Sequence, residues 1–128
     1  MQKLIITGRL GREPEMRFTP AGQQVTNFSV ATDRRYSTAE GEKKIVTTWF
    51  NIEVWGKLAE VCNQYLHKGN QVGIIGRLKD PRVYQAQDGT WKASTIEVVA
   101  ESVEFLTPKG ANGTDEPEAE AVAEEIPF

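Results

Sequence analysis

The sequence predicts an all-β protein, a small five-stranded Greek-key barrel with one helix and an acidic tail. Three observations predict this class. Apolar and polar residues alternate with a period of two over much of the first 106 residues. Glycine- and proline-containing turn signals separate these stretches. Only one segment, 57–67, changes to a helical period.

Three strands are predicted before this helical segment. The first is rich in β-branched and apolar residues, and Gly8 is expected to kink it. A turn signal at 19–22 ends a short extension. A polar loop with Gly41 at its middle separates the second strand from the third. The predicted elements are strands at Lys3–Leu10, Gln24–Arg35 and Ile45–Gly56, an extension at Glu15–Phe18 and a loop at 37–44.

One helix and two further strands complete the predicted domain. Apolar residues in the helical segment recur at i, i+3, i+4, i+7 and i+8, which is the spacing of one helix face. Lys68 and Gly69 are typical signals for the end of a helix. The residues of the apolar face are Leu58, Val61, Cys62, Tyr65 and Leu66. The elements that follow are strands at Asn70–Leu78 and Ser94–Leu106 and, between them, a polar hairpin at 79–92 with its tip at Asp88-Gly89.

The order of three strands, one helix and two strands favours a barrel of the oligonucleotide-binding (OB) type. Gly73 and Gly76 in the fourth strand are expected to allow bends or a close approach of another backbone. The pattern alone leaves two alternatives open, which are another small β-barrel and a five-stranded α+β domain.

The charge is divided unevenly along the chain. Residues 1–106 carry 14 Lys and Arg against 12 Asp and Glu, a net charge of +2, whereas 107–128 carry one Lys and six acids, a net charge of −5. Residues 107–125 have few large apolar side chains, so burial cannot offset the entropy of ordering them, and disorder is expected. The predicted organisation is an OB domain at 1–106, an acidic linker at 107–123 and a terminal segment at 124–128.

The sequence argues against an enzyme, a metal site and a membrane span. His67 is the only histidine and Cys62 the only cysteine, and neither has partners at metal-ligand spacing. Cys62 lies on the apolar helix face and is expected in the core. No nucleophile or phosphate-loop motif is present, and no cofactor is expected. The apolar runs are too short to span a membrane, and no secretory signal pattern is recognised. A lone cysteine fits a reducing compartment, so a cytoplasmic location is expected.

Two tryptophans fall on the polar face of the third strand. With a period of two, Trp49 and Trp55 share a face with Asn51 and Glu53, while the opposite face carries the apolar residues expected in the core. Six residues of strand separate the indoles by about 20 Å, which suits two stacking platforms along an extended ligand. A single exposed tryptophan is equally well explained by packing under a loop or in a subunit interface. The candidate stacking residues are Trp49, Trp55, Tyr36, Tyr84 and Trp91.

Basic residues are interleaved with these rings. Cations that follow the phosphates and aromatic faces that receive the bases form a groove for single-stranded nucleic acid, whatever its base sequence. Duplex DNA hides its base faces, and no basic cluster resembles a major-groove helix, so single strands are the expected ligand. The candidate phosphate-contacting residues are Lys3, Arg9, Arg34, Arg35, Lys43, Lys44, Lys57, Arg77, Lys79, Arg82 and Lys92.

A set of short motifs extends over nearly the whole chain. The motifs are Leu10-Gly11 with Pro14-Glu15, Phe28-Ser29-Val30-Ala31-Thr32, Trp49 followed by Trp55-Gly56-Lys57-Leu58-Ala59-Glu60, Tyr65-Leu66-x-Lys68-Gly69, Gly76-Arg77-Leu78 and Ile126-Pro127-Phe128. This set resembles the bacterial single-stranded DNA-binding protein (SSB) family. The resemblance implies an OB fold, a homotetramer with one OB domain per chain, and single-stranded DNA wrapped around the assembly.

The resemblance also implies roles for particular residues. Trp49, Trp55, Tyr36 and Tyr84 occupy the family's stacking positions, with tyrosine in place of the more usual tryptophan at 36 and 84, which is expected to weaken stacking. An acidic stretch with an apolar tip is expected to dock into enzymes of replication, recombination and repair, since an aromatic tip can fill an apolar pocket while acids steer the encounter. The residues of this predicted docking segment are Glu124, Glu125, Ile126, Pro127 and Phe128.

Three other functions remain open from the residues. An RNA-binding OB module would use the same stacking surface, because stacking does not distinguish ribose from deoxyribose. A primosome-type OB dimer is a second possibility, and the acidic tail argues against both. The third possibility is a purely structural barrel subunit, in which Trp49 and Trp55 would be buried between chains.

Overall fold

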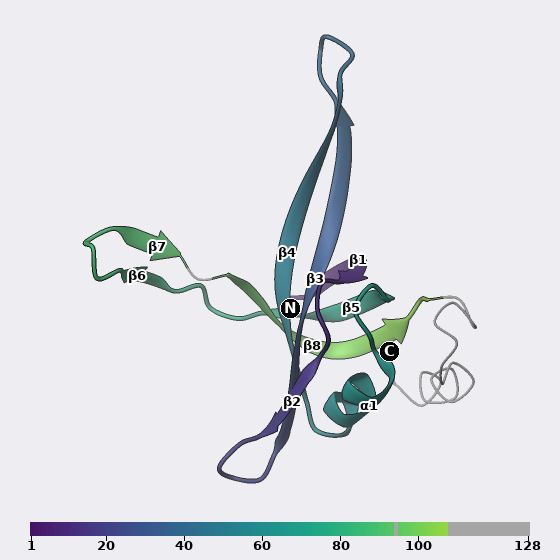
Figure 1. Cartoon of the computed structure of the whole chain (residues 1–128), viewed down its shortest axis with the longest axis vertical. Coiled ribbons are helices and arrows are strands. Elements are labelled where there is room, and N and C mark those ends of the chain that lie inside the picture. The colour runs from purple at the N-terminus through teal and green to yellow at the C-terminus, as the bar shows by residue number, and fades with distance from the viewer. Residues whose placement is uncertain (94, 108–128) are drawn as a thin grey trace.

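The computed structural model describes residues 1–93 and 95–107 (Figure 1). The predicted terminal segment at 124–128, and the predicted linker beyond Thr107, lie outside the described residues. No helix in the described part of the chain is long and apolar enough to cross a membrane. The elements in chain order are β1 (Leu4–Leu10), β2 (Glu15–Phe18), β3 (Gln24–Ser37), β4 (Lys43–Trp55), α1 (Lys57–Tyr65), β5 (Gln71–Leu78), β6 (Val83–Gln85), β7 (Trp91–Ala93) and β8 (Ile96–Phe105).

Five strands close into a barrel, which confirms the predicted OB architecture. The strand order is β1-β5-β8-β4-β3, and β3 returns to pair with β1 at Arg9 and Leu10. Neighbouring strands of the barrel are antiparallel except β4 and β8, which run parallel. The short β2 pairs with β3 outside the barrel, and β6 and β7 form a separate hairpin. Three hairpins, β2–β3, β3–β4 and β6–β7, project from the barrel (Figure 1).

The inward-facing side chains fill the barrel and pack against α1. Burying a large aliphatic or aromatic side chain contributes about 1.5–3 kcal/mol, so these residues supply most of the driving force for folding. The helix buries Ala59, Val61 and Cys62. It is tied to β3 by Thr26, whose Oγ1 donates to the carbonyl of Ala59 at 2.6 Å. The largest fully buried side chains include Phe28, Ile52, Leu66, Ile74, Val25, Val30, Val54, Val72, Val98 and Val103.

Cys62 is a core residue, as its place on the apolar helix face predicts. Its side chain is fully buried within the cluster that fills the barrel. Burial raises the pKa of the Cys62 thiol to about 12, because a thiolate would have to leave water for an apolar surrounding. The thiol therefore stays protonated at neutral pH and has no nucleophilic character.

The helix ends at Tyr65, two residues before the predicted end at His67. Leu66 adopts an extended conformation, with φ −89° and ψ 141°, although its N–H still donates to the carbonyl of Cys62. Only 2% of Leu66 is exposed, because the turn of the chain directs this side chain into the barrel. Gly69, with φ +90°, then reverses the chain toward β5 in a left-handed conformation that favours glycine.

The β3–β4 hairpin is longer than predicted. Pairing continues to Ser37 and Lys43, so the loop covers 38–42 and not 37–44. The polarity of this stretch predicted a loop, but a two-stranded ribbon that projects beyond the barrel is exposed on both faces and is polar for that reason (Figure 1). The other strand boundaries differ from the predicted ones by no more than two residues.

The predicted hairpin tip at Asp88-Gly89 is confirmed between β6 and β7. Asp88 Oδ1 accepts from both the backbone N–H of Thr90, at 3.0 Å, and its hydroxyl, at 2.6 Å. These two hydrogen bonds hold the pKa of the Asp88 carboxyl below its usual value. Gly89 has φ +88°, a conformation that glycine adopts at little cost.

Two glycines stand where strands of the barrel approach most closely. A Cβ at Gly8 would lie 2.2 Å from the carbonyl oxygen of Ala31, and a Cβ at Gly76 would lie 2.3 Å from that of Val99. Gly76 also adjoins the irregularity in the pairing of β5 with β8. The predicted close approach is thus confirmed at Gly76, whereas Gly73 would keep ordinary contacts, the nearest at 3.6 Å.

Glu13 joins the loop after β1 to the segment that follows α1. Its carboxylate accepts from the backbone N–H of Lys68 at 2.5 Å and lies 3.2 Å from His67 Nδ1. The hydrogen bond from Lys68 is the main cause that lowers the pKa of Glu13 from its ordinary value of 4.5, and the contact with His67 adds to it. The carboxylate form is therefore favoured by the folded state.

This contact predicts a measurable pH dependence of stability. A carboxyl whose pKa is lowered by folding stabilises the native state above its ordinary value of 4.5, and the stabilisation is lost as the pH falls through the lower native value. We expect Glu13→Gln to reduce the free energy of unfolding at pH 7 by at most about 1 kcal/mol, because the group is exposed. Urea titrations at pH 7 and pH 3 should show the difference from wild type shrinking at the lower pH. Glu40→Gln, in the β3–β4 loop, is the control, and equal losses for both variants would contradict the prediction.

Candidate nucleic-acid interface

Trp49 and Trp55 lie on the outer face of β4, on the side of the strand away from the core. Their cross-strand neighbours on β3 are Ala31 and Val25. Of their surfaces, 49% and 40% are exposed, so solvent reaches both indoles, as the alternation predicts. An extended strand places side chains six residues apart about 20 Å from each other. The face between them carries Asn51 and polar neighbours from β3 and β8.

Each indole is supported by a different neighbour. The ring of Trp49 lies against the loop after β1, where a Cβ at Gly11 would be 2.4 Å from the ring. The indole N–H of Trp55 donates to Glu53 Oε1 at 2.5 Å. A ring that is already held in place loses less freedom when a ligand stacks on it, so both contacts favour binding.

Tyr36 lies on the other face of the β3–β4 hairpin. Its cross-strand neighbour is Lys44, and its place in the alternation is that of Phe28 and not that of Ala31, the neighbour of Trp49. The ring is 42% exposed, and the guanidinium carbon of Arg34 lies 5.5 Å from its centroid. Tyr36 therefore forms a second surface with Arg34 and Lys44, near the tip of the hairpin.

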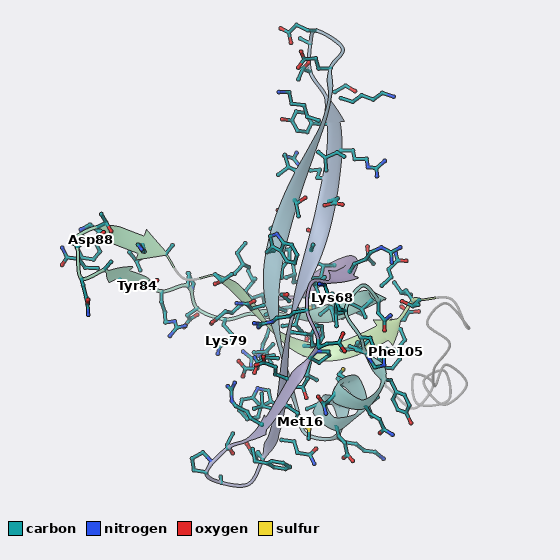
Figure 2. The ribbon with its side chains drawn as sticks, in the orientation of Figure 1. Met16, Lys68, Lys79, Tyr84, Asp88 and Phe105 are labelled. Carbon is teal, nitrogen blue, oxygen red and sulfur yellow. The ribbon has the colours of Figure 1, made fainter. Side chains whose placement is uncertain are left out.

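Tyr84 and Trp91 lie on the separate β6–β7 hairpin and face opposite sides of it. Tyr84 pairs with Lys92, whereas Trp91 pairs with Gln85. Both rings are well exposed. Figure 2 shows Tyr84 and Asp88 on this hairpin, away from the barrel. The five predicted stacking residues thus occupy four surfaces, and the structure brings only Trp49 and Trp55 onto one.

The predicted phosphate-contacting residues also lie in different environments, some engaged by other groups of the chain and some not. Lys57 lines a shallow concavity with Trp55, and Arg77, Lys79 and Arg82 line another near the start of β8. Several predicted cations are engaged within the chain: Lys3 with Glu101 at 2.7 Å, Arg9 with the carbonyl of Gly69 at 3.0 Å, Lys44 with Glu42 at 3.8 Å, Lys79 with Glu53 at 2.9 Å and Arg82 with Glu97 at 3.3 Å. Within residues 1–93 and 95–107, the candidates that form no salt bridge include Arg35, Lys43, Lys57, Arg77 and Lys92.

A concave polar surface that the sequence did not predict lies on the same face, between the two tryptophans. Arg17 of β2 takes part in it and donates to Asn27 of β3 at 3.0 Å. The polar residues of Glu15–Phe18 would indicate this surface only if the pairing of β2 with β3 were known, and the sequence does not give that pairing. The surface is lined by Arg12, Glu15, Arg17, Asn27, Asn51, Glu53, Lys79, Arg82 and Glu97.

Residues 1–106 match the model of the Single-strand binding protein family. The chain belongs to this family. It is 39% identical over 117 residues to a single-stranded DNA-binding protein of Neisseria meningitidis serogroup A and 40% identical over 116 residues to that of Staphylococcus aureus MRSA252. Each alignment covers 91% of this chain, but the chain spans only 66% of the length of the first relative and 72% of the second.

Solved structures of SSB proteins have the same fold. The Plasmodium falciparum SSB in complex with ssDNA has a TM-score of 0.72 and 27% identity, and the similarity covers 83% of this chain and 95% of that one. A deletion mutant of the Thermus aquaticus single-stranded DNA binding protein has a TM-score of 0.70 and 24% identity over 86% of this chain and 52% of that one.

Membership of the SSB family confirms two of the predictions from the sequence. The fold is the OB barrel that the motifs implied, and the family and its named relatives are DNA-binding proteins and not enzymes, in agreement with the prediction. The individual roles of the candidate stacking, phosphate-contacting and docking residues stay predictions.

Proposed function

We propose that this chain binds single-stranded DNA without regard to base sequence. The observation that carries the proposal is the pair of exposed, supported indoles on one polar face of β4. Stacking on such a ring contributes about 1–3 kcal/mol per base and tolerates every base. Cations around this face, such as Lys57 and Arg77, would add a salt-dependent contribution. The similar Plasmodium falciparum protein, solved with ssDNA, supports the choice of ligand.

The proposal includes a biological role. The chain coats and protects single strands that are exposed during replication, recombination and repair, in the cytoplasm and in association with the nucleoid. Membership of the SSB family and the names of its bacterial relatives support this role.

The proposal also includes assembly into a homotetramer, and β1 offers a surface for contact between copies. Ile5 is 71% exposed and lies next to Ile75 on the outer side of the barrel. β1 pairs with β5 along Leu4–Arg9 but meets β3 only at its end. In the described part of the chain, the other edge of residues 4–7 has no strand partner. An exposed apolar side chain beside an open strand edge is a surface that a second copy can cover.

A titration of the full chain tests the central proposal. Oligo-dT should quench the tryptophan fluorescence strongly at low salt, and the affinity should fall as salt rises. Light scattering of the same sample measures the mass of the assembly. Absence of quenching at low salt would contradict the groove, tighter binding of an RNA strand would favour an RNA-binding module, and a monomeric mass would contradict the tetramer.

Recruitment of partner enzymes is assigned to the docking segment predicted at 124–128, outside the described residues. We expect Phe128→Ala to leave oligo-dT affinity near the wild-type value, because the apolar tip lies apart from the stacking surface in sequence and chemistry. The same variant should lose pull-down of replication and repair enzymes, since an aromatic anchor commonly dominates such contacts. Pull-down equal to that of the wild-type chain would contradict the assignment.

A further inference from the structure

Glu53 is an acidic residue on a surface where nucleic acid is proposed to bind. It lies on β4 between Trp49 and Trp55 and points to the same face. A carboxylate at this position repels phosphate, so its presence needs a reason other than contact with the backbone of the ligand. Only 14% of its side chain is exposed, which makes an unpartnered charge costly there.

Both oxygens of Glu53 are used by residues of the chain. Oε1 accepts from the indole N–H of Trp55 at 2.5 Å, and Oε2 accepts from Lys79 Nζ at 2.9 Å. The carboxylate thereby joins an exposed ring of β4 to a cation that follows β5. The contact with the indole is charge-assisted, and such hydrogen bonds are about twice as strong as neutral ones.

Lys79 belongs to a small cluster in which the charges balance. Its ammonium also lies 3.9 Å from Glu97, which in turn is 3.3 Å from Arg82. The backbone N–H of Lys79 donates to the carbonyl of Glu97 at 2.9 Å, so the lysine is anchored at its main chain as well. Two carboxylates thus face two cations, and the ammonium is engaged before any phosphate arrives (Lys79 is labelled in Figure 2).

We propose that Glu53 is a positioning residue for the single-strand groove: it holds the Trp55 indole in a stacking orientation and keeps the positive charge of Lys79 from acting on phosphate. The proposal rests on the proposed function of the chain. The two roles of Glu53, orienting the indole and neutralising Lys79, can be separated by experiment. The indole needs only an acceptor oxygen at position 53, whereas Lys79 needs the negative charge.

Two substitutions at Glu53 separate the orientation of the Trp55 indole from the neutralisation of Lys79. Glu53→Gln keeps an acceptor oxygen for the indole but leaves the cluster with one uncompensated positive charge. Glu53→Ala removes both the acceptor and the charge. At about 1 M NaCl, where screening acts over about 3 Å, affinity for oligo-dT reports mainly on stacking. There we expect Glu53→Ala to bind about two- to tenfold more weakly, the cost of ordering one side chain, and Glu53→Gln to match the wild type.

The salt dependence of binding measures whether Glu53 keeps the charge of Lys79 from acting on phosphate. In Glu53→Gln the slope of log K against log salt concentration should steepen by about 0.7, the value for one additional phosphate contact with a single strand. Adding Lys79→Met to Glu53→Gln should return the slope to that of the wild type. Glu104→Gln is the matched control for net charge, because Glu104 is an exposed residue of β8 without a salt bridge among the described residues.

The indole contact can be followed without DNA. In amide spectra of the full chain, the indole N–H signal of Trp55, assigned with Trp55→Phe, should exchange slowly with water in the wild type and in Glu53→Gln, and rapidly in Glu53→Ala. Any one of three results would overturn the proposal. These are an equal loss of oligo-dT affinity in both Glu53 variants at high salt, an unchanged salt slope in Glu53→Gln, and rapid exchange of the Trp55 indole N–H in the wild type. Failure of the wild-type chain to bind oligo-dT would refute the proposed function instead, and the exchange measurement would still test the contact.

Discussion

Trp55→Ala is expected to weaken binding of oligo-dT by about 1–3 kcal/mol, which is about fivefold to 150-fold in the dissociation constant. Loss of a stacking surface causes the effect, and the fold should be retained because the indole is on the outer face of β4 and 40% exposed. Trp49→Ala should have an effect of the same size on binding. It should also cost some stability, since the Trp49 ring lies against Gly11. A fluorescence-independent method such as calorimetry is required, because each variant loses a reporter.

The conservative variant separates stacking from a structural role. Trp55→Phe keeps an aromatic face but loses the N–H that donates to Glu53, so it should bind more tightly than Trp55→Ala and less tightly than the wild type. Circular dichroism and a thermal melt of each variant serve as the control for folding. If Trp55→Ala unfolds the chain, or binds oligo-dT as well as the wild type does, the indole is not a platform for bases.

Gly76→Ala is expected to be the more damaging of two matched substitutions on β5. The new methyl group would lie 2.3 Å from the carbonyl oxygen of Val99, and the backbone at this point cannot move without disturbing the pairing of β5 with β8. Overpacking of this kind costs about 1–3 kcal/mol or more, and each kcal/mol corresponds to roughly 4–8 °C in Tm for a domain of this size.

Gly73→Ala is the control on the same strand. Its methyl group would meet its nearest neighbour, the Cβ of Glu104, at 3.6 Å, which is ordinary contact. Replacing a glycine where the backbone permits it can stabilise a protein by about 0.4–1 kcal/mol, through the unfolded state. The melts should be compared at one protein concentration, since assembly would raise both transitions. Equal melting temperatures for the two variants would contradict the close approach at Gly76.

Much of the site could be predicted because strand periodicity is a local property. Alternation along β4 places Trp49 and Trp55 on the side opposite Ile52 and Val54, and the structure agrees. Helical periodicity, which is equally local, likewise predicts Cys62 in the core, and the structure agrees. Strand alternation could not place Tyr36 relative to these rings, because polar residues near the hairpin tip resembled a loop, and the face of Tyr36 follows only once β3 is known to continue to Ser37.

The sequence by itself determined which face of β4 is buried and that the two indoles lie on the opposite face, because the period of two residues is set by the strand backbone alone. The OB class followed from the family motifs, since the pattern alone left two other small folds open. Only the tertiary structure decided where the helix ends, which glycine of β5 has no room for a side chain, and that Glu53 contacts Lys79, a residue 26 positions away. These features depend on contacts between distant segments: Leu66 turns into the barrel, Gly76 meets β8, and the end of β5 passes beside β4. Register and closure of the barrel create such contacts, and no local pattern encodes them.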